Sequence, residues 1–132
     1  AIGAKLVHPE KKILAVCGDG GFMMNCQEFE TALRAKTPFV TLVFNDSSYG
    51  LIKWKQMDQY GKSCCVDFTN PDFVKFAESM GAIGYRITKA EDLVPTLKKA
   101  FEQNVPVIID CPVDYAENTK LTAHLKELME KL

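Results

Sequence analysis

Two apolar, β-branched runs, each ending in a short loop that carries an aspartate and glycine, most constrain what this chain can fold into. The run 13–16 leads into the loop 17–22, and the run 39–43 leads into the loop 44–50. Each pair reads as a buried strand that runs out into a tight loop before a helix. If the two strands are parallel neighbours, Asp19 and Asp46 lie at the same edge of the sheet.

The remaining pattern alternates strands with helices. We expect strands at about 12–17, 39–45, 85–87 and 105–111, and helices over 28–34, from 51 to about 60, from 70 to 81 and from 90 to 101. Asn25 is the expected N-cap of the first of these helices. Asn70 is the expected N-cap of the third, with Pro71 at its first position. Residues 118–132 have the spacing of a terminal amphipathic helix.

The strands are continuously apolar, which is typical of a parallel sheet covered by helices on both faces. The sequence therefore predicts an α/β fold, and we expect residues 1–132 to form a single domain. Residues 1–7 resemble the end of a helix without a cap or an initiator methionine. We expect the chain to begin inside a longer protein, with its fold truncated at the N-terminus.

The charge and the cysteine content argue against several classes of function. The net charge of −1 gives no basic field for nucleic acid or anionic membrane, and the apolar runs are too short to span a bilayer. The five cysteines are odd in number and lack CxxC spacing, and there are only two histidines. This content argues against a zinc site and favours reduced thiols in the cytoplasm.

In parallel sheets, ligands bind beyond the carboxyl ends of the strands, where Asp19 and Asp46 are expected. Mg²⁺ prefers oxygen ligands in an octahedron and takes some of them from phosphate and water, so one or two carboxylates suffice. Glycines in the loops let backbone N–H groups approach an anion. The two loops therefore predict a divalent cation that holds a phosphate or diphosphate, although glycine and aspartate are also default turn residues.

Gly18-Asp19-Gly20 followed by Asn45-Asp46 resembles the thiamine diphosphate motif, which begins with GDG and ends in an asparagine pair. Within that family the chain is similar to catabolic acetolactate synthases, in which Asn-Asp-Ser replaces the asparagine pair and the last strand continues as Pro-Val-Asp-Tyr. Here these segments are residues 45–47 and 112–115. The likeness extends from residue 1 to about 118.

The resemblance implies a site for thiamine diphosphate and Mg²⁺. By position in the motif, the implied metal ligands are the carboxylates of Asp19 and Asp46 and the carbonyl of Ser48. The implied cofactor contacts are Gly18, Asp19, Gly20, Gly21, Asp46, Ser48, Tyr49, Gly50, Leu51 and Ile52. Gly20 and Gly21 would offer N–H groups to the diphosphate, Tyr49 and Gly50 would close its other side, and Leu51 and Ile52 would line the wall near the thiazolium ring.

The same resemblance implies a carboligase that acts on small 2-oxo acids. Trp54, Lys55 and Gln56 occupy the stretch that would approach the substrate, with packing as the alternative role of Trp54, and lysine at 55 departs from the family pattern. No catalytic residue is expected in this chain, because the acid that activates the aminopyrimidine would come from another domain. An isolated chain should be inactive, and its exposed apolar face should favour a homo-oligomer.

Two other readings remain open. Another decarboxylase or carboligase of the family fits the motif almost equally well. A non-catalytic Mg²⁺- or nucleotide-binding module is the alternative from a different class. A dinucleotide fold would need G-x-G-x-x-G, and residues 18–23 lack the last glycine. A phosphoacceptor module would need a lysine at a later strand end, for which Lys89 is poorly placed.

Overall fold

The computed structural model describes residues 1–115, and the helix expected over 118–132 lies outside them. Four parallel strands form one sheet in the order β1-β2-β4-β3. Its elements follow the chain as α1 (Ile2–Val7), β1 (Leu14–Gly18), α2 (Asp19–Met24), α3 (Glu28–Arg34), β2 (Val40–Asn45), α4 (Gly50–Tyr60), α5 (Phe73–Ser79), β3 (Ile83–Arg86), the 3₁₀ turn η1 (Ala90–Asp92), α6 (Leu93–Ala100) and β4 (Val107–Pro112). The predicted parallel α/β fold is confirmed.

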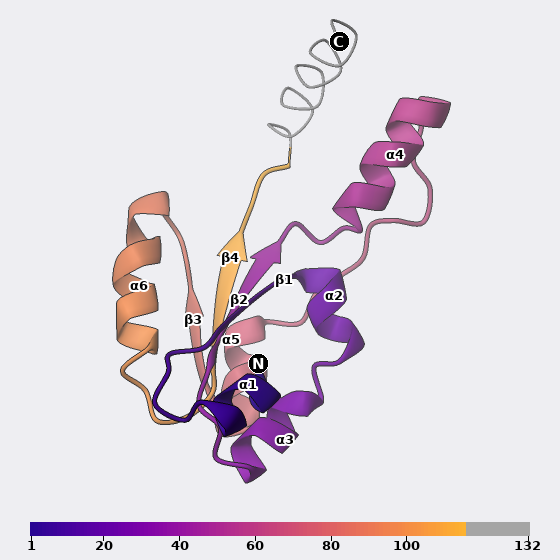
Figure 1. Cartoon of the computed structure of the whole chain (residues 1–132). Helices are drawn as coiled ribbons and strands as arrows, with labels where there is room; N and C mark the ends of the chain where they lie inside the picture. The colour runs from indigo at the N-terminus through magenta and orange to yellow at the C-terminus, as the bar shows by residue number, and fades with distance from the viewer. Residues whose placement is uncertain (116–132) are drawn as a thin grey trace, which may run out of the picture.

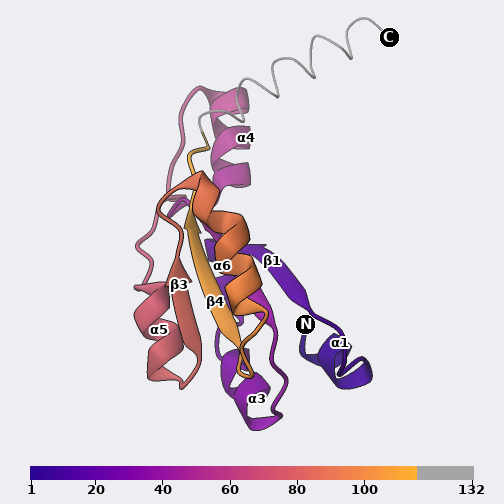
Figure 2. The ribbon, with the colours of Figure 1, turned by 90° about the vertical axis from the view of Figure 1, so that its left-hand side faces the viewer.

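Helices cover both faces of the sheet because β2 and β4 carry apolar side chains on both of their faces. Helices α2, α3 and α5 pack on one face and α6 packs on the other, as the two views in Figures 1 and 2 show. The first core includes Phe22, Phe29, Ala32, Val43, Phe73, Ala77 and Ile108. The second includes Val40, Leu42, Ala100, Val107, Ile109 and Cys111. This two-sided burial explains why the strands read as unbroken apolar runs.

Strand β1 is less covered than its neighbours. It lies at one edge of the sheet, and Leu14 and Val16 are 42% and 55% exposed on the face that α6 covers elsewhere. Figure 2 shows α6 in front of β3 and β4, with β1 standing clear of it. Ala15 and Cys17 point to the opposite face and pack against the first core. Strand β1 therefore buries only one of its two apolar faces.

Two predicted helix starts were wrong. Residues 19–24 form helix α2, which begins directly after β1. The next helix, α3, has Gln27 rather than Asn25 at its N-cap. Helix α5 begins at Phe73, and its N-cap is Asp72, whose Oδ1 accepts the N–H groups of Val74 and Lys75 at 3.1 and 3.3 Å. Asn70 is therefore not the cap of this helix.

No helix within residues 1–115 is both long enough and apolar enough to cross a membrane.

Candidate functional site at the carboxyl edge of the sheet

A cleft of about 290 Å³ lies beyond the carboxyl ends of β1 and β2, between α2 and the start of α4. Figure 1 shows these two helices at the end of the sheet to which the strand arrows point. We call it the carboxyl-edge cleft and define it by its twelve lining residues. They are Gly18, Asp19, Gly20, Gly21, Phe44, Asp46, Ser48, Tyr49, Gly50, Leu51, Ile52 and Tyr115. All ten residues expected to contact a cofactor line this one cleft.

Asp19 is the most constrained acid in the cleft. Its side chain is buried, with 2% of its surface exposed, at the first position of α2. Oδ1 accepts the N–H of Gly20 at 2.8 Å, while Oδ2 accepts the N–H of Ser47 at 2.7 Å and Nδ2 of Asn70 at 2.6 Å. Within residues 1–115 no cationic side chain forms a salt bridge with Asp19.

Asp46 follows the end of β2 and faces the same cleft. Its Oδ1 accepts the N–H of Ser48 at 3.3 Å. Burial, and after it the negative charge of Asp19, raises the pKa of the Asp46 carboxyl. Two carboxylates that disfavour each other's charge in a partly buried space are stabilised when a divalent cation binds between them.

The charge of Asp46 should therefore oppose folding in the absence of metal. A carboxyl whose pKa is raised in the folded protein destabilises it when ionised, and this effect is relieved as the pH falls through the raised pKa. In EDTA at neutral pH, we expect Asp46→Asn to increase the stability by less than about 1 kcal/mol, because the carboxyl is partly exposed. Thermal melts should show the difference shrinking on acidification. A lower melting temperature for the variant in EDTA would contradict this account.

Two glycines are required by close contacts in the cleft. A Cβ at Gly20 would lie 2.7 Å from Cε1 of Tyr49, and a Cβ at Gly50 would lie 2.9 Å from Oδ2 of Asp46. Gly18 and Gly21 have no neighbouring atom within 4 Å of the same position. The backbone on the α2 side is therefore open toward the cleft, so a ligand can approach its peptide groups closely.

The first turn of α4 presents a second set of donors. Its first backbone hydrogen bond runs from the N–H of Lys53 to the carbonyl of Tyr49, so the N–H groups of Gly50, Leu51 and Ile52 have no partner within the helix. This turn contains no acidic residue, and no side chain caps it. An uncapped N-terminus of an 11-residue helix at the wall of a cleft suits an anion such as phosphate.

The loop between β2 and α4 is held by a strand-like contact with residues 66–68. The N–H of Tyr49 and Oγ of Ser48 both donate to the carbonyl of Val66, at 2.8 and 3.3 Å, and the N–H of Phe68 donates to the carbonyl of Ser47 at 3.0 Å. Ser47 has a φ of 54°, an uncommon value for a residue other than glycine, and its N–H donates to Asp19. These contacts fix the loop that carries Asp46.

The donor set fits Mg²⁺ better than a transition metal. Residues 1–115 contain no group of three or more His, Cys, Asp or Glu side chains that could hold a metal. Asp19 and Asp46 supply two hard oxygen ligands, and the carbonyl of Ser48 lies outside the hydrogen-bond ladder of α4. A cation here must complete its coordination with phosphate oxygens and water, which is the usual situation of Mg²⁺.

The structure adds a polar path that sequence patterns did not indicate. It runs across the carboxyl ends of the strands through Arg86, Asp110, Asn45, Asn70 and Asp19. Nε of Arg86 donates to Oδ2 of Asp110 at 2.9 Å, Nη2 of Arg86 forms a salt bridge with the same oxygen at 2.8 Å, and Nδ2 of Asn45 donates to Oδ1 of Asp110 at 2.9 Å. Nδ2 of Asn70 joins Oδ1 of Asn45 at 3.0 Å to Oδ2 of Asp19. We call these five residues the polar path.

Asn70 therefore positions Asp19 instead of capping a helix. Its amide nitrogen donates to Asp19 and Asn45 and, at 3.4 Å, to Oγ of Ser47, while its own Oδ1 is buried with no hydrogen-bond partner among the described residues. Turning the amide over would place that oxygen against the Asp19 carboxylate. No local signal could have found this role, because Asn70 is 51 positions from Asp19.

The three residues expected near a substrate do not line the cleft. Trp54, Lys55 and Gln56 lie further along α4. Trp54 is half-buried and Lys55 is exposed. Oε1 of Gln56 accepts the N–H of Cys64 at 2.9 Å, so this side chain ties α4 to the loop that follows it.

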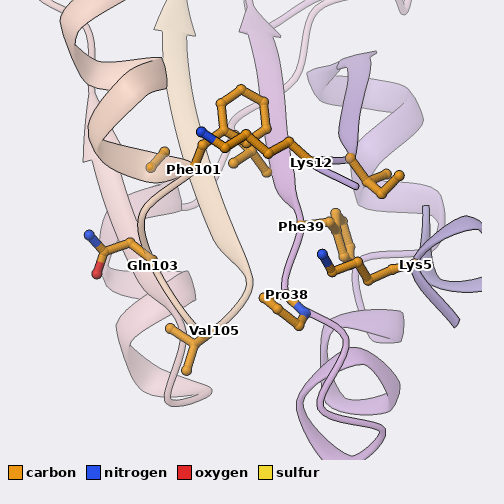
Figure 3. A pocket seen from close by; sticks show the side chains of 10 residues that line it. Lys5, Lys12, Pro38, Phe39, Phe101, Gln103 and Val105 are labelled. Carbon is orange, nitrogen blue, oxygen red and sulfur yellow. The ribbon is translucent and has the colours of Figure 1, made fainter. Parts of the chain in front are cut away.

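A second hollow, at the opposite end of the sheet, has different chemistry. Figure 3 shows it between Lys5, Pro38, Phe39 and Phe101. Nζ of Lys5 is already bonded to the carbonyls of Pro9 and Lys11 at 2.8 and 2.7 Å, and Nζ of Lys12 lies 5.7 Å from the centre of the Phe101 ring. This notch has a volume of only about 40 Å³, and no acid lines it. The carboxyl-edge cleft, where two acids and an uncapped helix end meet, is the candidate site.

Comparisons with known proteins show which proteins this chain is similar to. The family described as thiamine pyrophosphate enzyme, C-terminal TPP binding domain, matches residues 1–111. Acetolactate synthase of Bacillus subtilis (strain 168) is 46% identical over 123 residues, which are 93% of this chain and 22% of the relative. Catabolic acetolactate synthase of Raoultella terrigena is 36% identical over 131 residues, which are 98% of this chain and 23% of the relative.

A solved structure shares the fold. The thiamine diphosphate-dependent 4-hydroxybenzoylformate decarboxylase of Rhodococcus jostii RHA1 is 27% identical, with a TM-score of 0.77 over 88% of this chain and 23% of its own. The chain thus spans less than a quarter of each of these relatives.

Proposed function

Because this chain belongs to the thiamine pyrophosphate enzyme family, as its C-terminal TPP-binding domain, we propose that it anchors the diphosphate and Mg²⁺ of a carboligase of the acetolactate synthase type. The reaction would decarboxylate pyruvate and join the product to a second 2-oxo acid. One observation carries the proposal: the ten residues implied by the motif line a single cleft that contains both acids and an uncapped helix end. The 46% identity to an acetolactate synthase favours this reaction within the family.

In this proposal different residues of the chain bind the metal and the diphosphate. Asp19, Asp46 and the carbonyl of Ser48 hold Mg²⁺, and the peptide N–H groups of Gly20 and Gly21 and of the first turn of α4 bind the diphosphate oxygens. When bound, thiamine diphosphate supplies a carbon nucleophile and an electron sink for 2-oxo acids. Leu51 and Ile52, which are 65% and 52% exposed, form an apolar wall beside the cofactor that excludes water only when another surface covers it.

The rest of the activity would come from outside the described residues. We assign the acid that activates the cofactor to another domain and no catalytic residue to this chain. The apolar wall of the cleft, including Phe44, Tyr49 and Tyr115, is too exposed to shield a cofactor by itself. We therefore propose that residues 1–132 act as one domain of a larger cytoplasmic enzyme that assembles as a homo-oligomer across this cleft.

Two alternatives make different predictions. A 2-oxo acid decarboxylase of the same family is supported by the likeness to the Rhodococcus jostii RHA1 structure, and it would release an aldehyde without forming a new carbon–carbon bond. A non-catalytic Mg²⁺- or nucleotide-binding module would bind a nucleoside diphosphate as well as thiamine diphosphate. Product analysis with pyruvate and competition with a nucleoside diphosphate separate these readings.

Calorimetric titration of thiamine diphosphate into the complete polypeptide that contains this chain tests the proposal. We expect binding in Mg²⁺ and loss of binding in EDTA. The Asp46→Ala variant should bind at least about tenfold more weakly, a loss of about 1.4 kcal/mol. Asp58→Ala, which removes an exposed acid of α4 outside the cleft, is the matched control and should bind normally. Metal-independent binding, or equal losses in both variants, would contradict the proposal.

A further inference from the structure

Cys64 and Cys65 form an exposed pair of thiols on the connection between α4 and α5. Their Sγ atoms lie 3.2 Å apart, and both cysteines are free. The other three cysteines are separate from this pair: Cys17 and Cys26 are half-buried, and Cys111 is buried. We call Cys64 and Cys65 the dithiol. It has no role in the carboxyl-edge cleft.

The backbone on both sides holds the dithiol in place. The N–H of Cys64 donates to Oε1 of Gln56, and Val66 is buried with its carbonyl bonded to the N–H of Tyr49. Successive side chains of an extended chain point in opposite directions. Cys65 has a φ of 57°, in the left-handed region, and this turn breaks the alternation. The two sulfurs therefore face one another before any ligand binds.

The same geometry does not suit a disulfide. Consecutive Cα atoms are about 3.8 Å apart, whereas disulfides usually join Cα atoms roughly 4.4–6.8 Å apart. A bridging atom that holds the sulfurs further apart than a direct S–S bond relieves this conflict. The pair is therefore better placed to chelate one soft atom than to oxidise.

The spacing of the sulfurs selects the kind of atom. With bonds to sulfur of roughly 2.3 Å, sulfurs 3.2 Å apart subtend about 90° at the bound atom, whereas a tetrahedral ion such as Zn²⁺ would hold them about 3.8 Å apart. Zn²⁺ would also need further ligands, and residues 1–115 contain no group of three or more His, Cys, Asp or Glu side chains. Trivalent arsenic forms pyramidal compounds with bond angles near a right angle. When arsenic already carries one carbon substituent, it needs only two sulfurs.

We propose that the dithiol is a two-point binding site for monosubstituted trivalent arsenicals. An organic oxide of arsenic(III), R–As=O, reacts with both thiols to form two As–S bonds and one water. The two thiol protons leave with the oxygen, and arsenic and sulfur keep their oxidation states, so no oxidant or reductant is required. The hydrogen bond to Cys65 raises the pKa of the Cys64 thiol, which keeps it protonated and a weak nucleophile toward reagents that take one sulfur.

The probe is phenylarsine oxide, titrated into the reduced complete polypeptide and followed by intact mass and by peptide mapping. We expect one equivalent on the peptide that contains residues 64 and 65. The second As–S bond is intramolecular, so either Cys64→Ser or Cys65→Ser should weaken binding by at least about 100-fold. Cys26→Ser, which leaves the dithiol intact, is the matched control and should bind as the original protein does.

Displacement adds a second measurement that does not depend on the variants. Dithiothreitol should remove the arsenical at concentrations at which 2-mercaptoethanol leaves it bound, because only a dithiol can replace both As–S bonds. Single-serine variants that bind within threefold of the original protein would overturn the proposal. Displacement by the two reductants at equal thiol concentration, or by an equal concentration of Zn²⁺, would overturn it as well. Cofactor titration of the same samples is an independent readout, so this test stands whether or not the cleft binds thiamine diphosphate.

Discussion

Asp19→Ala is expected to lower the affinity for thiamine diphosphate with Mg²⁺ by at least about 100-fold, a loss of about 2.7 kcal/mol. The variant removes the buried carboxylate proposed as a metal ligand, and it also leaves the N–H groups of Gly20 and Ser47 without their acceptor and takes one acceptor from Nδ2 of Asn70. The first effect weakens the binding of the cation, and the second weakens the contacts that hold the loop carrying Asp46. Calorimetry of the complete polypeptide measures the affinity directly.

Asn70→Ala separates the two effects, because it keeps the carboxylate but removes one of its donors. Its affinity should fall between that of the original protein and that of Asp19→Ala. A circular dichroism spectrum that matches the original protein excludes unfolding as the cause in either variant. Near-normal metal-dependent binding by Asp19→Ala would show that the cation is held elsewhere.

Asp110→Ala is expected to cost about 2–4 kcal/mol of unfolding free energy. The carboxylate is fully buried, forms a salt bridge with Arg86, and accepts one hydrogen bond from Nε of Arg86 and one from Asn45. Removing one member of a buried pair leaves the other without compensation, which typically costs about 3–5 kcal/mol. The expected loss is smaller here because Arg86 is 47% exposed and can regain water. Urea unfolding measures the change.

A double-mutant cycle assigns this loss to the pair. Arg86→Ala alone should destabilise at least as much as Asp110→Ala alone, because it leaves a fully buried carboxylate without its cation, whereas Arg86 can regain water when Asp110 is removed. The double variant should be less destabilised than the sum of the two. Additive losses would mean that the two side chains do not interact in solution. Arg34→Ala, which removes one partner of an exposed pair with Glu30, is a suitable control and should change stability by less than about 1 kcal/mol.

The strands and the pair of acids could be predicted from sequence because both depend on short-range patterns. The apolar run at 39–43 is buried on both faces of the sheet, and the run at 13–16 buries one face against the first core. Unbroken apolar runs of this kind are typical of a parallel sheet with helices on both sides. Parallel strands end at one edge of the sheet, so the sequence alone predicts that Asp19 and Asp46 lie close together.

The helix starts and the polar path could not be predicted in the same way. Glycines at 20 and 21 have low helix propensity, yet α2 begins at Asp19 because Phe22 is buried among Phe29, Phe73 and Phe76. Asn70 and Asp72 are both good capping residues, and their sequence does not say which one caps. A tertiary contact distinguishes the two residues. Asn70 donates a hydrogen bond to Asp19, and Asp72 is the N-cap of α5.

The polar path takes one side chain from the end of each strand: Arg86 from β3, Asp110 from β4, Asn45 from β2 and Asp19 directly after β1. The acid at one edge is therefore oriented through contacts that reach the opposite edge. A local unfolding event that separates β3 from the sheet also removes the hydrogen bond from Arg86 to Asp110. The site is therefore complete only while all four strands are paired. A ligand that binds only the closed form must, by mass action, suppress openings of β3, a strand that does not contribute to the cleft. Ligand binding in the cleft should therefore increase the protection of the β3 amides against hydrogen exchange.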